Sequence, residues 1–292
     1  MSIEVEMNNT RSNYQRNLRK VLRFLPYIVL IVMLASSMIP LVSMLGSSFR
    51  SKETFLTTRS ILPQVWSLDF YRQVLRDPRI IGYFRNSLVV AVVVSFFTVI
   101  VSVLGGYSLA RFKGKVKGIR LFIVFILMVQ MFPTIQMIIP LYLTFNALGV
   151  MNKAYTLMIA YPAFTLPMNL MMMQSFIEGV PYEMEEAGLI DGCTRMQTIV
   201  RLVLPVSIPG VASSMILAFN HCWNEFLIAM LFARSDVYKT IPIGLHNYMQ
   251  EHNSDWGAIL AASTLMIIPV LLFLNVLQKH IVSGLTLGSV KG

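Results

Sequence analysis

Charged residues are scarce in this chain. Only 13% of its 292 residues are Asp, Glu, Lys or Arg, whereas 55% are hydrophobic. A soluble domain typically carries about 25% charged residues, so the composition argues against an ordinary soluble protein and indicates a membrane protein. The net charge of +10 does not indicate a nucleic-acid partner, because basic loops beside anionic membrane lipid account for it better.

Cysteine and metal-binding patterns are also nearly absent. The two cysteines, Cys193 and Cys222, form no CxxC pair and are too few for a disulfide framework, so we expect them to be structural. The four histidines are scattered, and no His/Cys cluster has the spacing of a metal site. We therefore expect no metal.

The chain also lacks a phosphate-binding loop. Gly114-Lys115 is followed by Val116 and has no preceding glycine at the required spacing, so it cannot cradle nucleotide phosphates. No arrangement of Ser, His and acidic residues suggests hydrolysis. We predict that the chain is not an enzyme and holds no cofactor of its own.

Long apolar runs are what the chain has in abundance. Six apolar segments, uncharged apart from Glu225 in the fifth, are long enough to cross a bilayer, which takes about 20 helical residues. Inside lipid the backbone must satisfy its own hydrogen bonds, so these segments should be helices. They lie near residues 24–45, 86–110, 121–143, 154–177, 206–233 and 258–278. The predicted fold class is all-α, a polytopic membrane protein with six transmembrane helices.

The distribution of basic residues predicts the orientation. Residues 111–120 include five Lys/Arg, which argues that this loop is cytoplasmic. The seven Lys/Arg of the opposite loop, 47–85, are spread more thinly. We therefore predict a cytoplasmic N-terminal tail at 1–23, a transmembrane domain at 24–280 and a cytoplasmic C-terminal tail at 281–292.

A polar segment separates the fourth and fifth predicted spans, at residues 178–205, and we call it the acidic loop. Its residues 181–205 read PYEMEEAGLIDGCTRMQTIVRLVLP. Pro181 suits the start of a helix, and Gly192 suits its end. Helices that lie on a membrane surface are usually rich in Lys and Arg, whereas this one would be repelled by anionic lipid. We interpret the acidic loop as a docking surface for a protein partner.

Part of the acidic loop matches the pattern of a known family. The matching residues are Glu186, Ala187, Gly192, Leu204 and Pro205. The loop resembles the EAA loop of bacterial ABC importer permeases, which has Glu-Ala-Ala, a glycine a few residues later and a hydrophobic-Leu-Pro ending. Gly188 stands where the second alanine is usual and keeps that position small. The resemblance covers essentially the whole chain.

Two further stretches resemble the carbohydrate-uptake branch of this family. They are Trp223-Asn224-Glu225 and residues 284–292, and they are similar to the smaller permease subunit of the maltose transporter. The resemblance implies that the acidic loop couples to an ATPase through Glu183, Glu185, Glu186, Ala187, Gly188, Asp191, Gly192, Leu204 and Pro205. It implies that the C-terminal tail reaches the ATPase through Gly284, Leu285, Thr286, Lys291 and Gly292.

The resemblance also implies a set of partners and a mechanism. The partners are a second permease in a heterodimer, an ABC ATPase dimer that holds ATP and Mg, and an extracytoplasmic solute-binding protein. Together they would import a sugar or oligosaccharide across the bacterial plasma (inner) membrane by alternating access. A non-sugar solute remains an alternative. An ion-coupled secondary transporter is a second one, although such folds usually show paired repeats and none is evident here.

Polar residues inside the predicted spans suggest a solute path. In the fifth span, Asn220 with Asn224 and His221 with Glu225 are i,i+4 pairs. A charged side chain at mid-membrane costs roughly 2.5–3.5 kcal/mol on insertion scales, so an intramembrane acid is a functional hypothesis. Glu225 is also compatible with a place near the outer interface or a bond to a neighbouring helix. The candidate path residues are Asn220, His221, Trp223, Asn224, Glu225 and Gln130.

Overall fold

The computed structural model of the chain describes residues 2–55, 60, 62–251 and 255–288. It describes no side chains for residues 2–23, 247, 248, 250, 251 and 281–288. Its helices are α1 (Ser2–Ser48), α2 (Asp69–Arg76), α3 (Pro78–Phe112), α4 (Ile119–Met131), α5 (Thr134–Ala147), α6 (Thr156–Ala160), α7 (Pro162–Glu178), α8 (Tyr182–Ile190), α9 (Arg195–Thr198), the π-helix η1 (Ile199–Val203), α10 (Leu204–Val206), α11 (Ile208–Asn224), α12 (Leu227–Phe232), α13 (Ile241–Glu251) and α14 (Trp256–Gly288). The described residues form no β-strand beyond a single bridge between Arg50 and Trp66, which confirms the all-α class.

Membrane-spanning helices are present in the predicted regions. Four helical stretches are long and apolar enough to cross a membrane: Phe24–Ser48, Pro78–Phe112, Thr156–Glu178 and Trp256–His280. Two bent helix pairs raise the number to six among the described residues if each pair counts as one span. The predicted number of spans is thus reached only by including broken helices.

The third predicted span is not one continuous helix. α4 and α5 meet at an angle of 101°, and Phe132 and Pro133 between them have extended backbones with ψ of 129° and 132°. A residue that precedes proline is pushed out of the helical region by the proline ring, which explains the break at Phe132. The third predicted span therefore turns sharply at Pro133.

The fifth predicted span, at 206–233, is broken twice. α11 is bent by 82° from the helical run Arg195–Val206 that precedes it. At its other end α11 stops at Asn224, because Glu225 is extended with ψ of 127°, and α12 begins at Leu227. Only the middle of the predicted segment is a straight helix.

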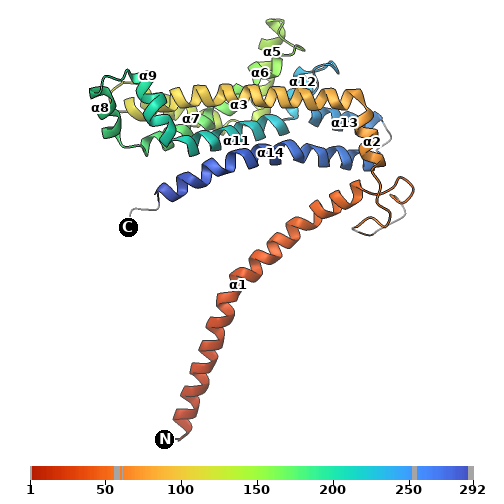
Figure 1. Ribbon diagram of the computed structural model, residues 1–292, viewed down its shortest axis with the longest axis vertical. Coiled ribbons are helices and arrows are strands. Elements are labelled where there is room, and N and C mark those ends of the chain that lie inside the picture. The colour runs from red at the N-terminus through yellow and green to blue at the C-terminus, as the bar shows by residue number, and fades with distance from the viewer. Residues whose placement is uncertain (1, 56–59, 61, 252–254, 289–292) are drawn as a thin grey trace. The chain divides into compact units, whose positions relative to one another are not determined.

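Residues 73–292 form one compact unit, separate from residues 1–72. In it α3, α7, α11 and α14 run side by side, and α8 and α9 lie together at one end of this bundle (Figure 1). α3 and α7 approach closely at Gly106, where an added Cβ would lie 2.8 Å from the backbone nitrogen of Gln174. This contact sets the spacing of the two helices that support the acidic loop.

Residues 1–72 contain α1 and most of the loop predicted at 47–85. The aromatic rings of this loop pack on one another: Phe49 lies 4.9 Å from Tyr71 and 5.7 Å from Trp66 between ring centroids, and Phe55 lies 5.4 Å from Phe70. The loop therefore has a small apolar core of its own.

Candidate functional site

The acidic loop folds as two helical limbs around a sharp turn. α8 begins directly after Pro181, which has an extended backbone, and ends at Ile190. Gly192 follows with φ of +86°, a left-handed conformation that glycine adopts without a steric penalty. Thr194 then starts the second limb with a capping box, in which its side chain and that of Gln197 each accept from the other's backbone N–H. The predicted helix stop at Gly192 is confirmed.

The second limb contains a π-helix. α9 continues directly into η1, which continues into α10. π-helical turns are rare and occur mostly as single turns within α-helices, often at functional sites. No sequence signal used above pointed to this turn. Leu204 and Pro205 of the predicted motif form the short α10, which ends just before the 82° bend into α11.

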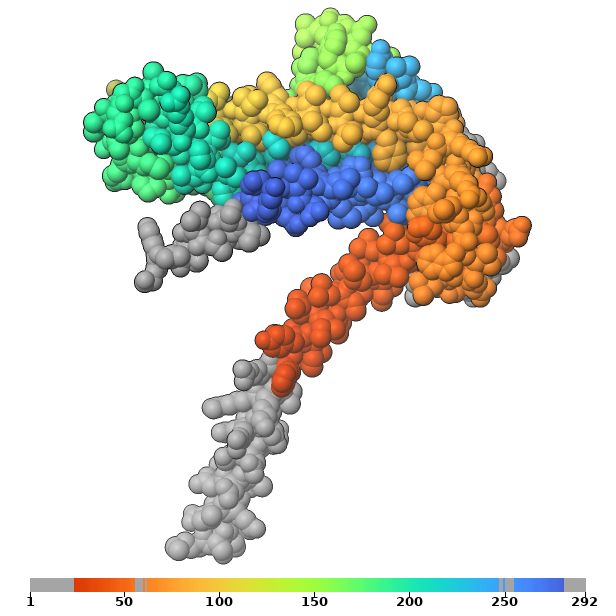
Figure 2. All heavy atoms as spheres, in the orientation of Figure 1, coloured from red at the N-terminus to blue at the C-terminus, as the bar shows by residue number. Residues whose placement is uncertain are grey.

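The acidic residues of the loop fall into two groups. Glu183, Glu186 and Asp191 are exposed, whereas the side chain of Glu185 is only 1% exposed. Apolar side chains also lie uncovered near the turn, and Ile190 is 85% exposed. Figure 2 shows the two limbs as a rounded end of the bundle, with no other described element of residues 73–292 over them on this face. The loop thus presents an acidic and apolar surface suited to a protein partner.

Glu185 binds within the chain. Its Oε1 accepts a hydrogen bond from Arg111 Nε at 2.7 Å, and its Oε2 accepts one from the Tyr107 hydroxyl at 2.8 Å. Arg111 also donates from Nη2 to the backbone oxygen of Val180 at 2.8 Å. We call these contacts of Glu185, Arg111, Tyr107 and Val180 the Glu185 clasp. Sequence reasoning missed the clasp, although Tyr107 and Arg111 are spaced i,i+4 and therefore share a face of α3.

Small residues in α8 have two different surroundings. Gly188 is buried against the second limb, where an added Cβ would lie 2.4 Å from Leu202 Cδ1. Its small size therefore serves contact between the limbs, whereas the expectation was contact with another protein. Ala187 is exposed and leaves the outer face of α8 flat.

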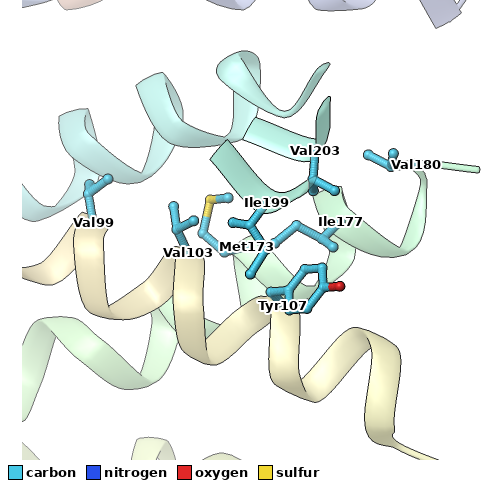
Figure 3. Close-up of a cluster of buried hydrophobic side chains, with 8 residues drawn as sticks. All are labelled: Val99, Val103, Tyr107, Met173, Ile177, Val180, Ile199 and Val203. Carbon is cyan, nitrogen blue, oxygen red and sulfur yellow. The ribbon is translucent and has the colours of Figure 1, made fainter. Parts of the chain in front are cut away.

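A hydrophobic cluster lies beneath the loop. It joins α3, α7 and η1 and includes Val99, Val103, Tyr107, Met173, Ile177, Val180, Ile199 and Val203 (Figure 3). Tyr107 belongs to this cluster through its ring and to the Glu185 clasp through its hydroxyl. Apolar and ionic contacts therefore connect the same helices.

Three of the candidate path residues line adjoining hollows between α4, α5, α7 and α11. One hollow, of about 280 Å³, is lined by Asn220 and His221 with Phe164, Met168 and neighbouring residues. The other, of about 200 Å³, is lined by Gln130 and also by His221, Phe164 and Met168. His221 therefore lies between the two hollows.

Glu225, another candidate path residue, stabilises the break between α11 and α12. Glu225 accepts from the backbone N–H groups of Ile228 at 2.8 Å and Ala229 at 3.0 Å, and from the Tyr161 hydroxyl at 3.1 Å. These bonds satisfy N–H groups that the start of a helix leaves unpaired. Of the alternatives for Glu225, the structure shows the bond to a neighbouring helix.

Two neighbours of Glu225 have separate places. Asn224 donates to the backbone and side-chain oxygens of Asn220, both at 2.9 Å. Trp223 is only 1% exposed, and its ring stacks on Phe219 at 5.7 Å between centroids. Trp223 therefore packs in the bundle core and does not face the hollows described above.

The C-terminal candidates are only partly within the described residues. Gly284, Leu285 and Thr286 belong to the last turns of α14, so the predicted tail at 281–292 begins as helix. Lys291 and Gly292 lie outside the described residues. In the searched part of the chain, no group of three His, Cys, Asp or Glu side chains is placed to hold a metal ion.

Known proteins match this chain over most of its length. The family model of the binding-protein-dependent transport system inner membrane component matches residues 102–287. The sulfoquinovosyl glycerol transport system permease protein SmoH of Agrobacterium fabrum is 34% identical, with 94% of each chain covered. The trehalose/maltose transport system permease protein MalG of Thermococcus litoralis is also 34% identical, with 92% of this chain and 97% of that protein covered.

A solved structure has the same fold. It is a chain of a bacterial ABC transporter involved in the import of the acidic polysaccharide alginate, with a TM-score of 0.79 and 21% sequence identity. The match covers 89% of this chain and 96% of the other. At this identity the likeness concerns the fold alone.

Proposed function

Because the chain belongs to the family of binding-protein-dependent transport system inner membrane components, we propose that it is a permease subunit of an ATP-driven importer of a sugar or oligosaccharide. The chain is a multi-pass inner-membrane protein. Family membership disfavours the ion-coupled secondary transporter that the sequence left open. A non-sugar solute remains the second candidate, because a coupling loop does not specify the solute.

The exposed face of the acidic loop carries this proposal. It combines the carboxylates of Glu183, Glu186 and Asp191 with the uncovered side chain of Ile190. An amphipathic helix that lays apolar residues into a groove is a recurrent way of binding a protein partner. The loop also lies beside the basic residues 111–120, since Arg111 and Lys113 form ion pairs with Glu185 and Glu178. Positive charge favours the cytoplasm, the compartment where an ATPase would supply energy.

The proposed mechanism is alternating access. Closure of an ATPase dimer on ATP moves the docked α8, and the spans rock between inward-facing and outward-facing states. A second permease forms a heterodimer with this chain, and a solute-binding protein releases the solute on the outer side. Both termini are cytoplasmic in this proposal, and residues 284–292 contact the ATPase. ATP and Mg belong to the ATPase subunits.

The proposed solute path includes the hollows beside α11. Gln130, Asn220 and His221 offer amide and imidazole groups there, and Phe164 offers an aromatic ring. Pockets for small molecules are mostly apolar with a few polar groups that fix orientation. Sugar hydroxyls suit such groups. The names of SmoH and MalG, which refer to sulfoquinovosyl glycerol and to trehalose and maltose, favour a carbohydrate.

The test is uptake by the reconstituted complex. We expect Gly192→Pro and Glu186→Lys to abolish ATP-driven uptake and weaken ATPase binding while the chain still inserts. Proline fixes φ near −65°, which is incompatible with the +86° of Gly192. Glu53→Lys reverses an exposed acid in residues 1–72 and serves as the control.

Two results would contradict this proposal. One is uptake that persists without the ATPase, and the other is uptake that survives both loop variants. The solute class is a separate question, and binding of labelled mono- and oligosaccharides to the partner binding protein tests it.

A further inference from the structure

The Glu185 clasp connects α8 to α3 on the side of the loop that faces the bundle. The side chains of Arg111 and Glu185 are 9% and 1% exposed, so the ion pair is shielded from water and salt. Both carboxylate oxygens are occupied, one by Arg111 and one by Tyr107. Glu185 therefore has no oxygen left exposed for a docking protein, in contrast to Glu183 and Glu186 on the same helix.

One guanidinium group joins three segments. Arg111 lies on α3, binds Glu185 on α8 and donates to the backbone oxygen of Val180 between α7 and α8. Its guanidinium carbon also lies 5.7 Å from the centre of the Tyr182 ring at the start of α8. α8 is thus attached to α3 at its first turn and at its middle.

The second limb is attached to the same helix end. The guanidinium carbon of Arg195 lies 5.2 Å from the centre of the Phe112 ring at the end of α3. Ile199 and Val203 of η1 pack in the cluster with Val99 and Val103 of α3 (Figure 3). Separating the second limb from α3 would expose this apolar surface, and separating α8 from α3 would leave the charges of Glu185 and Arg111 without each other.

We propose that Glu185 and Arg111 are positioning residues that make α8 and the cytoplasmic end of α3 move as one rigid body. This proposal rests on the proposed import function. A displacement applied to the exposed face of α8 reaches the transmembrane helices only if the loop does not move separately. The clasp supplies that rigidity because removing one partner of a buried ion pair leaves an uncompensated charge. Glu185 acts through α3 and makes no contact with the ATPase.

The first experiment measures rigidity in the chain itself. Spin labels at Ser108 on α3 and Ile190 on α8, both exposed, report the distance between the two elements by double electron–electron resonance. Cys193 and Cys222 are replaced by Ser beforehand. We expect a narrow distance distribution that Glu185→Gln broadens and Glu178→Gln does not. Glu178 is the matched control because it too forms an ion pair with the end of α3, through Lys113. Its pair connects α7 instead of α8 and is exposed.

The second experiment measures coupling in the assembled complex. With binding protein and ATPase present, we expect Glu185→Gln to lower the solute imported per ATP hydrolysed by roughly tenfold, because the loop then moves without α3. The amount of ATPase bound should stay within about twofold, since the exposed face is unchanged. A role in stability alone would lower the yield of complex and leave the ratio of solute to ATP in the surviving complexes unchanged.

A double variant tests whether the two residues act together. Glu185→Gln with Arg111→Gln removes both charges and leaves neither unpaired, so the double variant should import no less solute per ATP than Arg111→Gln alone. Losses that multiply would show independent roles and overturn the proposal. If Glu185→Gln does not assemble, Tyr107→Phe removes only one hydroxyl and should broaden the distances and lower the ratio about twofold. Tyr155→Phe, at an exposed tyrosine, is its control.

The outcomes separate this proposal from the import function. A wild-type complex without ATP-driven uptake contradicts the import function whatever the distance measurements show. If the wild-type complex imports normally, and Glu185→Gln keeps a narrow distance distribution and the wild-type ratio of solute to ATP, the positioning role of the Glu185 clasp is contradicted. Loss of ATPase binding in Glu185→Gln with unchanged distances would place Glu185 at the docking surface and overturn its positioning role.

Discussion

Glu185 and Glu225 mark two regions of the molecule that are built differently. Each accepts a hydrogen bond from a tyrosine hydroxyl, Glu185 from Tyr107 at 2.8 Å and Glu225 from Tyr161 at 3.1 Å. The other contacts differ. Glu185 accepts a hydrogen bond from the Arg111 cation on α3, a helix far away in the sequence. Glu225 accepts from two backbone N–H groups in the first turn of α12.

We call the acidic-loop end of the bundle, where an ion pair holds two helices together, the rigid end. We call the region of broken helices around Glu225 the jointed middle. An ion pair between two helices opposes their relative movement, and in the acidic loop it is backed by a shared hydrophobic cluster. A carboxylate that caps the next helix stabilises a local change of direction, here between α11 and α12. In our proposal the loop end of the bundle receives a displacement, and the spans change shape at the broken helices near the hollows.

The largest expected effect comes from removing the cation at the rigid end. Arg111→Met leaves the Glu185 carboxylate buried without its cation and with only the Tyr107 hydroxyl as a side-chain partner, and the loss of one partner of a buried ion pair typically costs about 3–5 kcal/mol. We expect uptake to fall by about 100-fold or more, with a lower yield of folded protein. Lys117→Met, at an exposed cation of the same basic stretch, should behave like wild type. Equal losses in both variants, measured by transport and detergent-solution melting, would erase the distinction between buried and exposed cations.

The second effect concerns the jointed middle. Glu225→Ala removes the acceptor for the N–H groups of α12, and the loss of such a cap typically costs about 1 kcal/mol. We expect uptake to drop by roughly fivefold to tenfold, and Glu225→Gln, which keeps one acceptor oxygen, to lose less. Transport assays on both variants check this order. Equal losses for Gln and Ala would indicate that the charge of Glu225 matters more than its role as a cap.

A third comparison removes one hydroxyl from the middle. Tyr161→Phe deletes the donor to Glu225 and leaves both backbone bonds to α12 in place. A single intramolecular hydrogen bond contributes about 0.5–1.5 kcal/mol net, and at 3.1 Å this one should lie at the low end. We expect uptake to fall about twofold to threefold, less than in Glu225→Ala, which removes this bond together with both backbone bonds to α12. A loss that exceeds that of Glu225→Ala would give Tyr161 a role apart from the carboxylate.

The smallest effect is expected for an ion pair outside the spans in which the side chain of Asp236 is 58% exposed and that of Lys239 is 16% exposed. The hydrogen bond from Lys239 lowers the pKa of Asp236, so this pair adds stability above the usual carboxyl pKa of about 3.9 and loses it as the pH falls through the lowered value. Exposed pairs contribute less than about 1 kcal/mol. Asp236→Asn should therefore shift the melting temperature at neutral pH by no more than about 2 °C. A shift as large as that of Arg111→Met would mean that burial does not distinguish these pairs.

Local features of the acidic loop were predictable from sequence. The helix stop at Gly192 follows from the conformational freedom of one residue, and its φ of +86° confirms it. Outside the loop, the extended backbone of Phe132 follows from the proline after it. The 101° angle was not predictable, because the direction after a break depends on packing against distant helices.

The clasp was harder to predict because it joins residues far apart in sequence. Glu185 and Arg111 are separated by 74 positions. α8 carries two further glutamates, both exposed, and no local pattern in the sequence distinguishes them from the buried Glu185. Arg111 was interpreted only as part of a basic, cytoplasmic stretch. The roles of the loop and of the path residues in transport remain predictions, since they depend on proteins other than this chain.

The π-helix has a consequence for chain length. η1 fits one residue more into its turn than an α-helix would, and each residue of an α-helix rotates the chain by about 100°. Deleting one residue within Ile199–Val203 should therefore convert the turn to α-helix and leave the phase of the limb nearly unchanged, whereas a one-residue deletion in an α-helical part of the limb should rotate α8 and α9 relative to α11 by about that angle. In the second case the outward face of α8 would point in a different direction while its composition stayed the same. The length of the α-helical part of this limb, as well as its residues, determines where the loop can dock.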